Sequence, residues 1–161
     1  MNKKQFLDYL FYRIGNQETD FKISGLQRTE EGDKSTKWYP YSEKVMTINP
    51  DEDYKINWAN QRQILPCEIV IDLEERETFE GTILRLKKRG IFFYAYDTGS
   101  RGYHIHIFFD ENLSEKQKRK YIQRYSGDEQ LASGKHMINL EYAPHWKSGK
   151  IKRLVAKNES K

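Results

Sequence analysis

The sequence predicts an α+β fold: one domain in which helices flank a mixed or antiparallel sheet. Two observations carry this prediction. The chain has 161 residues, a length that fits one compact hydrophobic core. Between residues 66 and 109 the hydrophobic pattern indicates strand, helix, strand, strand. We therefore assign residues 1–161 to a single domain whose motifs fall within residues 66–155, with residues 1–60 as an accessory part of it.

The N-terminal third begins with a helix and continues without a clear period. Apolar side chains recur at helical spacing in residues 3–14, which predicts an amphipathic helix that ends at Gly15. Residues 17–60 alternate short apolar pieces with polar runs. That pattern predicts only short strands and loops.

A strand and a helix are predicted after Pro66. The β-branched run Ile69–Ile71 is typical of a buried strand, and acidic residues follow it. Residues 76–89 then place apolar side chains at helical spacing, with glutamates near the start and basic residues at the end. This order of charges suits the helix dipole, and Gly90 ends the predicted helix.

The second half of the chain predicts further strands and a basic helix. Two aromatic-rich strands, IFFYAY and GYHIHIFF, flank a polar turn at residues 97–101. Ser114 is a suitable N-cap for a helix over residues 113–125. Residues 136–142 and 151–155 have the pattern of additional strands. The core order is therefore β-α-β-β, which is RRM-like.

Composition narrows the class of protein. Aromatic residues make up 14% and charged residues 32% of the chain, which excludes both a disordered tail and a membrane protein. The N-terminus lacks the apolar run of a signal peptide, and Cys67 is the only cysteine. We therefore expect an intracellular, cytoplasmic protein without a membrane partner, in which carboxylates or histidines hold any metal.

The net charge of +4 is uneven along the chain. Residues 1–111 hold 16 Lys and Arg against 19 Asp and Glu, a balance of −3, whereas residues 112–161 hold 12 against 5, a balance of +7. A basic surplus suits a polyanionic partner, but a solvated lysine-rich surface produces the same count. Charge alone therefore does not decide between these two interpretations.

Two carboxylates end the predicted buried strand. Asp72 and Glu74 are two residues apart, so their side chains point the same way in an extended chain. Two carboxylates held together bind a divalent cation through hard oxygen atoms. In the alternative interpretation, Asp72 caps the following helix and Glu74 lies in its first turn.

Two histidines share one face of a later strand. His104 and His106 follow the turn Ser100–Gly102. In that turn, Arg101 has the geometry for paired contacts to phosphate oxygens, and Gly102 lets the backbone approach a ligand closely. A single histidine here is more often structural, whereas the pair beside this turn favours phosphate or metal binding.

A third polar segment, His145–Lys150, gathers a histidine and several cations around a tight turn. As point charges and hydrogen-bond donors, these groups suit a triphosphate. Turns rich in Lys, Ser and Gly are also ordinary exposed hairpins. This segment therefore supports triphosphate binding only in combination with the two segments that precede it.

Taken in order, the three segments resemble the motifs of the archaeo-eukaryotic primase superfamily, which contains primase small catalytic subunits and primase-polymerases. The similarity covers residues 66–155. The family's acidic pair at a strand end is matched by Asp72-Leu73-Glu74. Its serine-glycine-histidine motif is matched by Ser100–His104, and its H-x-K-T-G-like turn resembles His145–Gly149.

The resemblance implies a template-dependent nucleotidyltransferase, a DNA primase or primase-polymerase that makes short primers on single-stranded DNA. It implies that Asp72 and Glu74 bind the catalytic Mg²⁺ or Mn²⁺ ions and that His104 is also catalytic. The residues that would hold the incoming nucleotide are Ser100, Arg101, His104, His145 and Lys147.

The resemblance also implies a third metal carboxylate, which we assign to Asp128. It lies seventeen residues before His145, where the family's acid falls. Glu141 is a nearer competitor, but it stands where the family often has a small residue or proline. In that position Glu141 would instead buttress neighbouring cations.

The chain departs from the family in two respects. A single cysteine cannot build the zinc element that many members carry. The chain is also short, whereas primases commonly use a further subunit, helical domain or helicase domain to grip the template. The implied partners are therefore single-stranded DNA, nucleoside triphosphates, and a second primase subunit, helicase or other replication protein.

Two other classes account for part of the sequence. The segment His104–His106 has the His-hydrophobic-His form of replication-initiator and relaxase endonucleases, in which Tyr121 or Tyr125 would be the nucleophile. A non-catalytic RRM-like nucleic-acid-binding domain would instead use the aromatic strand to stack bases. The endonuclease leaves the turn at His145 unused, and the binding domain leaves the carboxylates idle.

Overall fold

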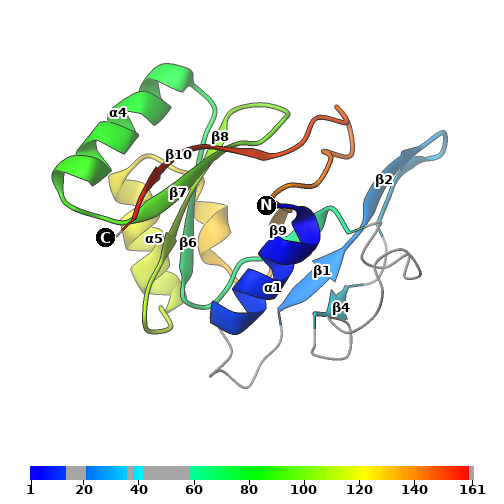
Figure 1. Cartoon of the computed structure of the whole chain (residues 1–161), viewed down its shortest axis with the longest axis horizontal. Helices are drawn as coiled ribbons and strands as arrows, with labels where there is room; N and C mark the ends of the chain where they lie inside the picture. The colour runs from blue at the N-terminus through cyan, green and yellow to red at the C-terminus, as the bar shows by residue number, and fades with distance from the viewer. Residues whose placement is uncertain (14–20, 36–37, 42–58, 160–161) are drawn as a thin grey trace. The chain divides into compact units, whose positions relative to one another are not determined.

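Helices and antiparallel strands combine in the computed structural model, which confirms the α+β class (Figure 1). The structure describes all residues except 14–20, 36–37, 42–58 and 160–161. The chain forms two compact units: the N-terminal unit, Met1–Gln63 with Met137–Lys152, and the motif unit, Ile64–His136 with Arg153–Lys161. The assignment of the whole chain to one domain stays a prediction.

The motif unit is built on a four-stranded sheet with the order β10-β7-β8-β6. Its strands are β6 (Glu68–Leu73), β7 (Phe93–Asp97), β8 (Tyr103–Phe108) and β10 (Arg153–Asn158). Since β6 and β7 both run antiparallel to the intervening β8, they are parallel to each other. Helix α4 (Arg76–Lys88) is the crossover between them, so the predicted β-α-β-β order is present as a split βαβ unit.

Helices α4 and α5 (Glu115–Arg124) cover one face of this sheet. Ile71 and Ile105 from the strands pack there with Phe79 of α4 and Ile122 of α5. Side chains alternate along a strand, so the neighbours of Ile105 in β8 point to the opposite face. None of the helices in the described part of the chain combines the length and apolar character needed to cross a membrane.

Helix α5 begins at the predicted cap. The Ser114 hydroxyl accepts a hydrogen bond from the Gln117 backbone N–H at 3.1 Å, and the Gln117 side chain accepts one from the Ser114 N–H at 2.8 Å. This reciprocal capping box satisfies two N–H groups that the helix leaves open. The chain leaves the helix through Ser126, whose φ is 58°, and then forms the short 3₁₀ helix η1 (Glu129–Ala132).

The N-terminal unit contains the predicted first helix, α1 (Lys3–Arg13), which buries Phe6, Leu7 and Leu10. Its sheet has the order β4-β1-β5-β9, and β2 pairs with β3 in a separate hairpin. The strands are β1 (Lys22–Ser24), β2 (Leu26–Thr29), β3 (Gly32–Ser35), β4 (Tyr39–Pro40), β5 (Gln61–Gln63) and β9 (Met137–Asn139). The short strands predicted between residues 17 and 60 are thereby confirmed where the structure describes them.

Two predicted strands have different bounds. Strand β9 stops at Asn139 instead of residue 142, because the chain turns there and Tyr142 takes a φ of 63°. The last strand begins at Arg153, since Ile151 forms only an isolated bridge with Pro144. Within β10 the pairing register with β7 shifts after Leu154, which marks a β-bulge.

Candidate functional site

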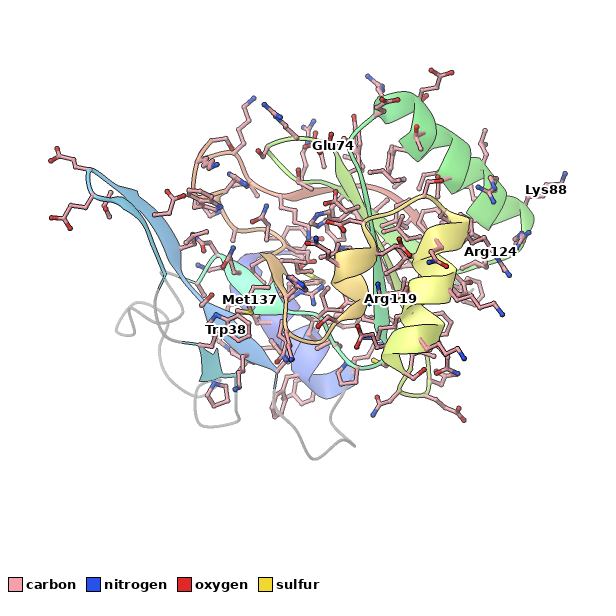
Figure 2. All side chains as sticks on the ribbon, turned by 180° about the vertical axis from the view of Figure 1, so that it is seen from behind. Trp38, Glu74, Lys88, Arg119, Arg124 and Met137 are labelled. Carbon is pink, nitrogen blue, oxygen red and sulfur yellow. The ribbon has the colours of Figure 1, made fainter. Side chains whose placement is uncertain are left out.

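The acidic pair lies where β6 ends. Asp72 faces His104 across the β6–β8 ladder, and its Oδ1 is 3.7 Å from the His104 Nε2. That separation suits an ion pair but is too long for a direct hydrogen bond. The Asp72 side chain is 34% exposed, and Glu74 is exposed between β6 and α4, at the opposite end of that helix from Lys88 (Figure 2). Glu74 is therefore accessible to solvent, and Asp72 is partly so.

The turn before β8 packs against this strand end. Gly102 has a φ of 81°, and a Cβ at this position would lie 2.3 Å from the Leu73 carbonyl oxygen and 2.7 Å from the Glu74 Cα. Only glycine allows such a close approach. Backbone packing therefore holds the turn that carries Ser100 and Arg101 beside the acidic pair.

Thr98 fixes the shape of the same turn, although sequence reasoning did not single it out. Its hydroxyl lies 3.2 Å from the carbonyl oxygens of Arg101 and Gly102, and its backbone N–H donates to the Gly102 carbonyl at 3.2 Å. Thr98 is buried, whereas Ser100 and Arg101 are exposed. A hydroxyl that bonds to nearby backbone stabilises a turn, and this leaves the outer residues to contact a ligand.

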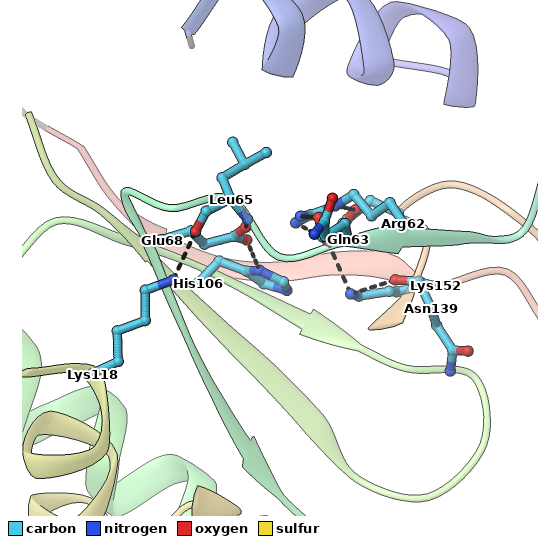
Figure 3. Close-up of polar contacts among 9 residues, drawn as sticks. Arg62, Gln63, Leu65, Glu68, His106, Lys118, Asn139 and Lys152 are labelled. Carbon is cyan, nitrogen blue, oxygen red and sulfur yellow. Dashed lines mark hydrogen bonds and ion pairs between the residues drawn. The ribbon is translucent and has the colours of Figure 1, made fainter. Parts of the chain in front are cut away.

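The second histidine of β8 belongs to a buried pair. His106 Nδ1 lies 2.7 Å from Glu68 Oε1, with side chains 1% and 0% exposed (Figure 3). The other Glu68 oxygen accepts a hydrogen bond from the Leu65 N–H at 3.0 Å, and Lys118 donates to the Leu65 carbonyl at 2.9 Å. Burial lowers the pKa of Lys118. His106 therefore has an internal partner, whereas His104 faces the acidic pair.

The third predicted segment lies in the N-terminal unit. His145 is buried, and its Nδ1 accepts hydrogen bonds from the backbone N–H groups of Lys147 at 3.1 Å and Ser148 at 3.4 Å. Since Nδ1 is the acceptor, the neutral ring carries its proton on Nε2. Burial, together with the charge of Lys147, lowers the pKa of His145. His145 is therefore a neutral hydrogen-bond donor at Nε2.

Lys147 is oriented by an aromatic neighbour. Its Nζ lies 4.6 Å from the centroid of the Trp146 ring, and that ring stacks on His145 with the two centroids 5.8 Å apart. An ammonium over an indole face gains a cation–π attraction. The Lys147 charge is thereby held over the ring while its side chain stays exposed.

Glu141 is neutralised inside the N-terminal unit. Its carboxylate accepts hydrogen bonds from Arg62 Nε at 2.8 Å and Arg62 Nη2 at 2.9 Å, and Lys152 Nζ donates to it at 3.0 Å (Figure 3). Lys152 also donates to the Asn139 carbonyl at 2.9 Å. The Glu141 side chain is fully buried, so its oxygens serve neighbouring cations, as in the buttressing alternative.

Asp128 occupies a different setting, in the motif unit. It is exposed and caps η1, and its Oδ1 accepts a hydrogen bond from the Gln130 N–H at 3.0 Å. The preceding Gly127 packs on β6, since a Cβ there would lie 3.1 Å from Ile71 Cγ2. Ile71 lies on the helix-covered face of β6, whereas Asp72 alternates to the other face, so this contact does not bring Asp128 to the acidic pair.

The donor set fits Mg²⁺, although the described residues hold no group of three or more His, Cys, Asp or Glu side chains close enough to bind a metal ion. Mg²⁺ and Mn²⁺ prefer oxygen ligands. Mg²⁺ usually keeps several waters and is held by one or two carboxylates together with substrate phosphates. Asp72, which is partly exposed, and Glu74, which is exposed, supply two carboxylates beside a turn suited to phosphate.

The tyrosines of α5 lie away from the histidines. Tyr125 is 1% exposed in the core between α5 and the sheet, and Tyr121 packs against the same core. His104 and His106 alternate with core residues of β8, so they point to the other face. A tyrosine nucleophile must reach the metal that the histidines hold, and this arrangement separates the two.

The aromatic strand offers little surface for base stacking. Phe93 is fully buried, Tyr96 is 3% exposed, and only Phe92 in this segment is largely exposed. Stacking of bases requires open ring faces. The geometry therefore gives no support to a binding domain that reads nucleic acid through this strand.

Comparison with known proteins bears on the fold. No family model and no curated protein matches the sequence. The crystal structure of the primase RepB′ superimposes on the chain with a TM-score of 0.60 and 13% sequence identity. The chain has a primase-like fold. The match covers 98% of this chain and 57% of the RepB′ primase chain, so this chain spans just over half of that protein's length.

Proposed function

We propose that the chain is a template-dependent nucleotidyltransferase of the archaeo-eukaryotic primase type, a primase or primase-polymerase that makes short primers on single-stranded DNA. One observation carries the proposal. At the end of β6, Asp72 faces His104, and Gly102 holds the turn of Ser100 and Arg101 against the same strand end. The primase-like fold supports the same class.

The proposed reaction joins a nucleotide to a growing strand. The 3′-oxygen of the strand attacks the α-phosphorus of a nucleoside triphosphate, the bond to the β-phosphate breaks, and pyrophosphate leaves. Negative charge builds on the phosphate oxygens, and donors held in place nearby stabilise it. Arg101 would supply the compensating positive charge and hydrogen bonds, with His104 and the Ser100 hydroxyl as further hydrogen-bond donors.

Two carboxylates would hold the cofactor, Mg²⁺ or Mn²⁺. Asp72 and Glu74 are the proposed ligands, with Asp128 as the third acidic residue of the site. A bound divalent ion supplies a Lewis acid that lowers the pKa of the 3′-hydroxyl and neutralises phosphate charge. Asp128 is preferred to Glu141, because the Glu141 carboxylate is buried between Arg62 and Lys152.

We also propose that His145 binds the nucleotide phosphates. Its neutral ring has a donor at Nε2, and a neutral donor binds a phosphate oxygen without needing a proton from solution. Lys147 is the adjacent cation in this role. The further partners we propose are single-stranded DNA as template and a second primase subunit, helicase or other replication protein.

The decisive experiment measures primer synthesis. The purified chain, a single-stranded template, labelled nucleoside triphosphates and Mg²⁺ or Mn²⁺ should give extended products. Asp72→Ala with Glu74→Ala should lower that activity by about a thousandfold, because the proposed metal ligands are gone. The matched control, Asp110→Ala with Glu111→Ala, removes two exposed carboxylates just after β8 and should keep full activity.

Circular dichroism and the thermal midpoint should be the same for both double variants. Synthesis that survives in Asp72→Ala with Glu74→Ala would overturn the proposal. A covalent tyrosine adduct on nicked DNA that disappears in Tyr121→Phe or Tyr125→Phe would instead identify an endonuclease. His104→Ala should raise KM for the nucleotide more than it raises Kd for the template, and equal changes in both would contradict its phosphate role.

A further inference from the structure

Four exposed cations meet where α4 and α5 end in the motif unit. Arg85, Lys88 and Arg89 come from the last turn and cap of α4, and Arg124 is the last residue of α5. Arg85 Nη2 donates to the Arg124 carbonyl at 3.4 Å, which joins the two helix ends. Lys88 and Arg124 lie on the same side of the molecule (Figure 2). We call this group the basic corner.

Aromatic rings lie beside these cations. The Arg85 guanidinium carbon is 4.8 Å from the centroid of the Tyr125 ring. Burial raises the pKa of Tyr121, while the positive charges of Arg124 and Arg89 act against that rise. Both arginines therefore lie within electrostatic reach of one half-buried tyrosine.

The basic corner has no acidic counterpart in the described residues. The ion pairs of α4 and α5 lie toward the N-terminal ends of the helices, where Arg76 pairs with Glu80 and Arg119 pairs with Glu115. None of the four corner cations has a carboxylate within 4.0 Å among the residues that the structure describes. One cation at each helix end complements the dipole, but four together repel one another unless an anion binds.

We propose that the basic corner binds the phosphate backbone of a nucleic-acid strand, an inference that rests on the proposed primer synthesis. Three of its four cations are arginines, whose planar forks match phosphate oxygens in pairs. Neutralisation of phosphates supplies most of the sequence-independent affinity for nucleic acids. Tyr121 adds a half-buried aromatic ring, and aromatic rings commonly accompany cations on surfaces that bind single strands.

The basic corner is remote from the acidic pair. Helix α4 starts two residues after Glu74 and has 13 residues, so its far end lies about 18 Å away at a rise of ~1.5 Å per residue. At ~3.4 Å per nucleotide, about five nucleotides span that distance. Since α4 and α5 cover the face opposite His104, the basic corner would hold a part of the strand well away from its reacting end.

The test compares two variants that each lose two positive charges. Arg89→Gln with Arg124→Gln changes the basic corner, and Lys22→Gln with Lys135→Gln removes exposed cations elsewhere. Fluorescence anisotropy measures Kd for a labelled oligothymidine of about 30 nucleotides from ~50 to ~200 mM salt. The corner variant should bind about tenfold more weakly at low salt, and its log–log salt slope should fall by about 1.4, at ~0.7 per phosphate contact. The control should keep the wild-type slope.

A second double variant distinguishes the loss of positive charge from a disturbance of the fold. Arg89→Lys with Arg124→Lys retains both charges and should keep the wild-type salt slope. Identical slopes for the wild type and Arg89→Gln with Arg124→Gln would overturn the inference. So would a corner variant that loses binding to polyglutamate but not to oligothymidine, since the surface would then fit an acidic protein.

The inference and the proposed function fail in different ways. Asp72→Asn with Glu74→Gln should lose primer synthesis and keep the full salt slope of DNA binding. If the wild type makes no primers while the corner variant still loses slope, the basic corner stands and the primase proposal falls. If primers form and the slope does not change, the primase proposal stands alone.

Discussion

Two carboxylates, Glu141 in the N-terminal unit and Asp72 in the motif unit, lie in contrasting environments. In the N-terminal unit, Glu141 is fully buried and accepts hydrogen bonds from Arg62 and Lys152. In the motif unit, the Asp72 side chain is 34% exposed, and its Oδ1 lies 3.7 Å from the His104 Nε2. A buried carboxylate between two cations has a structural role, because its removal would leave their charges buried without compensation. The Asp72 carboxylate at the end of β6 is partly accessible to solvent, which is why we propose Asp72, and not Glu141, as a metal ligand.

The largest loss of stability is expected from substitution of the buried carboxylate, Glu141. Glu141→Gln leaves Arg62 and Lys152 buried without their counter-charge, and breaking a buried pair costs about 3–5 kcal/mol. Urea unfolding followed by fluorescence measures this loss. Glu80→Gln breaks an exposed pair with Arg76 and should leave the unfolding midpoint unchanged. A midpoint for Glu141→Gln equal to that of wild type would remove the distinction between the two kinds of carboxylate.

A smaller effect is expected where the turn packs on β6. Gly102→Ala places a Cβ 2.3 Å from the Leu73 carbonyl at a φ of 81°, so the backbone must move, at a cost of about 2–4 kcal/mol. Gly90→Ala has the same sign of φ, at 69°, but meets open space and should cost about 1 kcal/mol. Thermal unfolding measures both. Primer synthesis should fall in the Gly102 variant alone. Equal activity in the two variants would show that this turn is not part of the active site.

The smallest effect concerns pH. Burial, together with the charge of Lys147, lowers the pKa of His145, so the folded state favours the neutral ring. In the unfolded chain, the His145 ring takes up a proton near the ordinary histidine pKa of ~6.5. Just below that pH, the unfolded chain therefore binds more protons than the folded chain. Stability should fall as the pH drops below ~6.5 toward the folded pKa. An NMR titration of the His145 ring with a midpoint at or above that of a model peptide would contradict this.

Local patterns of the sequence predict most of the motif unit. The β-branched run at Ile69–Ile71, the charge order of α4 and the cap at Ser114 are each read within about one helical turn or strand. They lie where expected. The strands near the C-terminus have shifted bounds, because the positive φ of Tyr142 arises in a turn whose N–H donates to the distant Lys152 carbonyl.

The candidate site likewise has parts that local sequence predicts and parts that depend on residues distant in the sequence. The sequence predicts the strands of Asp72 and His104 as parts of one β-α-β-β unit, and the structure shows that these two strands pair. The partner of His106 could not be predicted, because Glu68 lies 38 residues away and resembles any other acidic residue. The same holds for Glu141 and Arg62, which are 79 residues apart. Pairing of distant polar groups depends on the assembled fold, and the periodicity of a single sequence does not reveal which groups pair.

The bulge in β10 has a consequence for how the protein behaves at high concentration. β10 is an outer strand of its sheet, and the shift after Leu154 interrupts the regular row of backbone groups that a second molecule would need for pairing. Arg153 and Lys157 also place exposed charges along this edge. Charged, bulged edges oppose the growth of a sheet from one molecule into the next. This edge should therefore resist aggregation during storage and crystallisation.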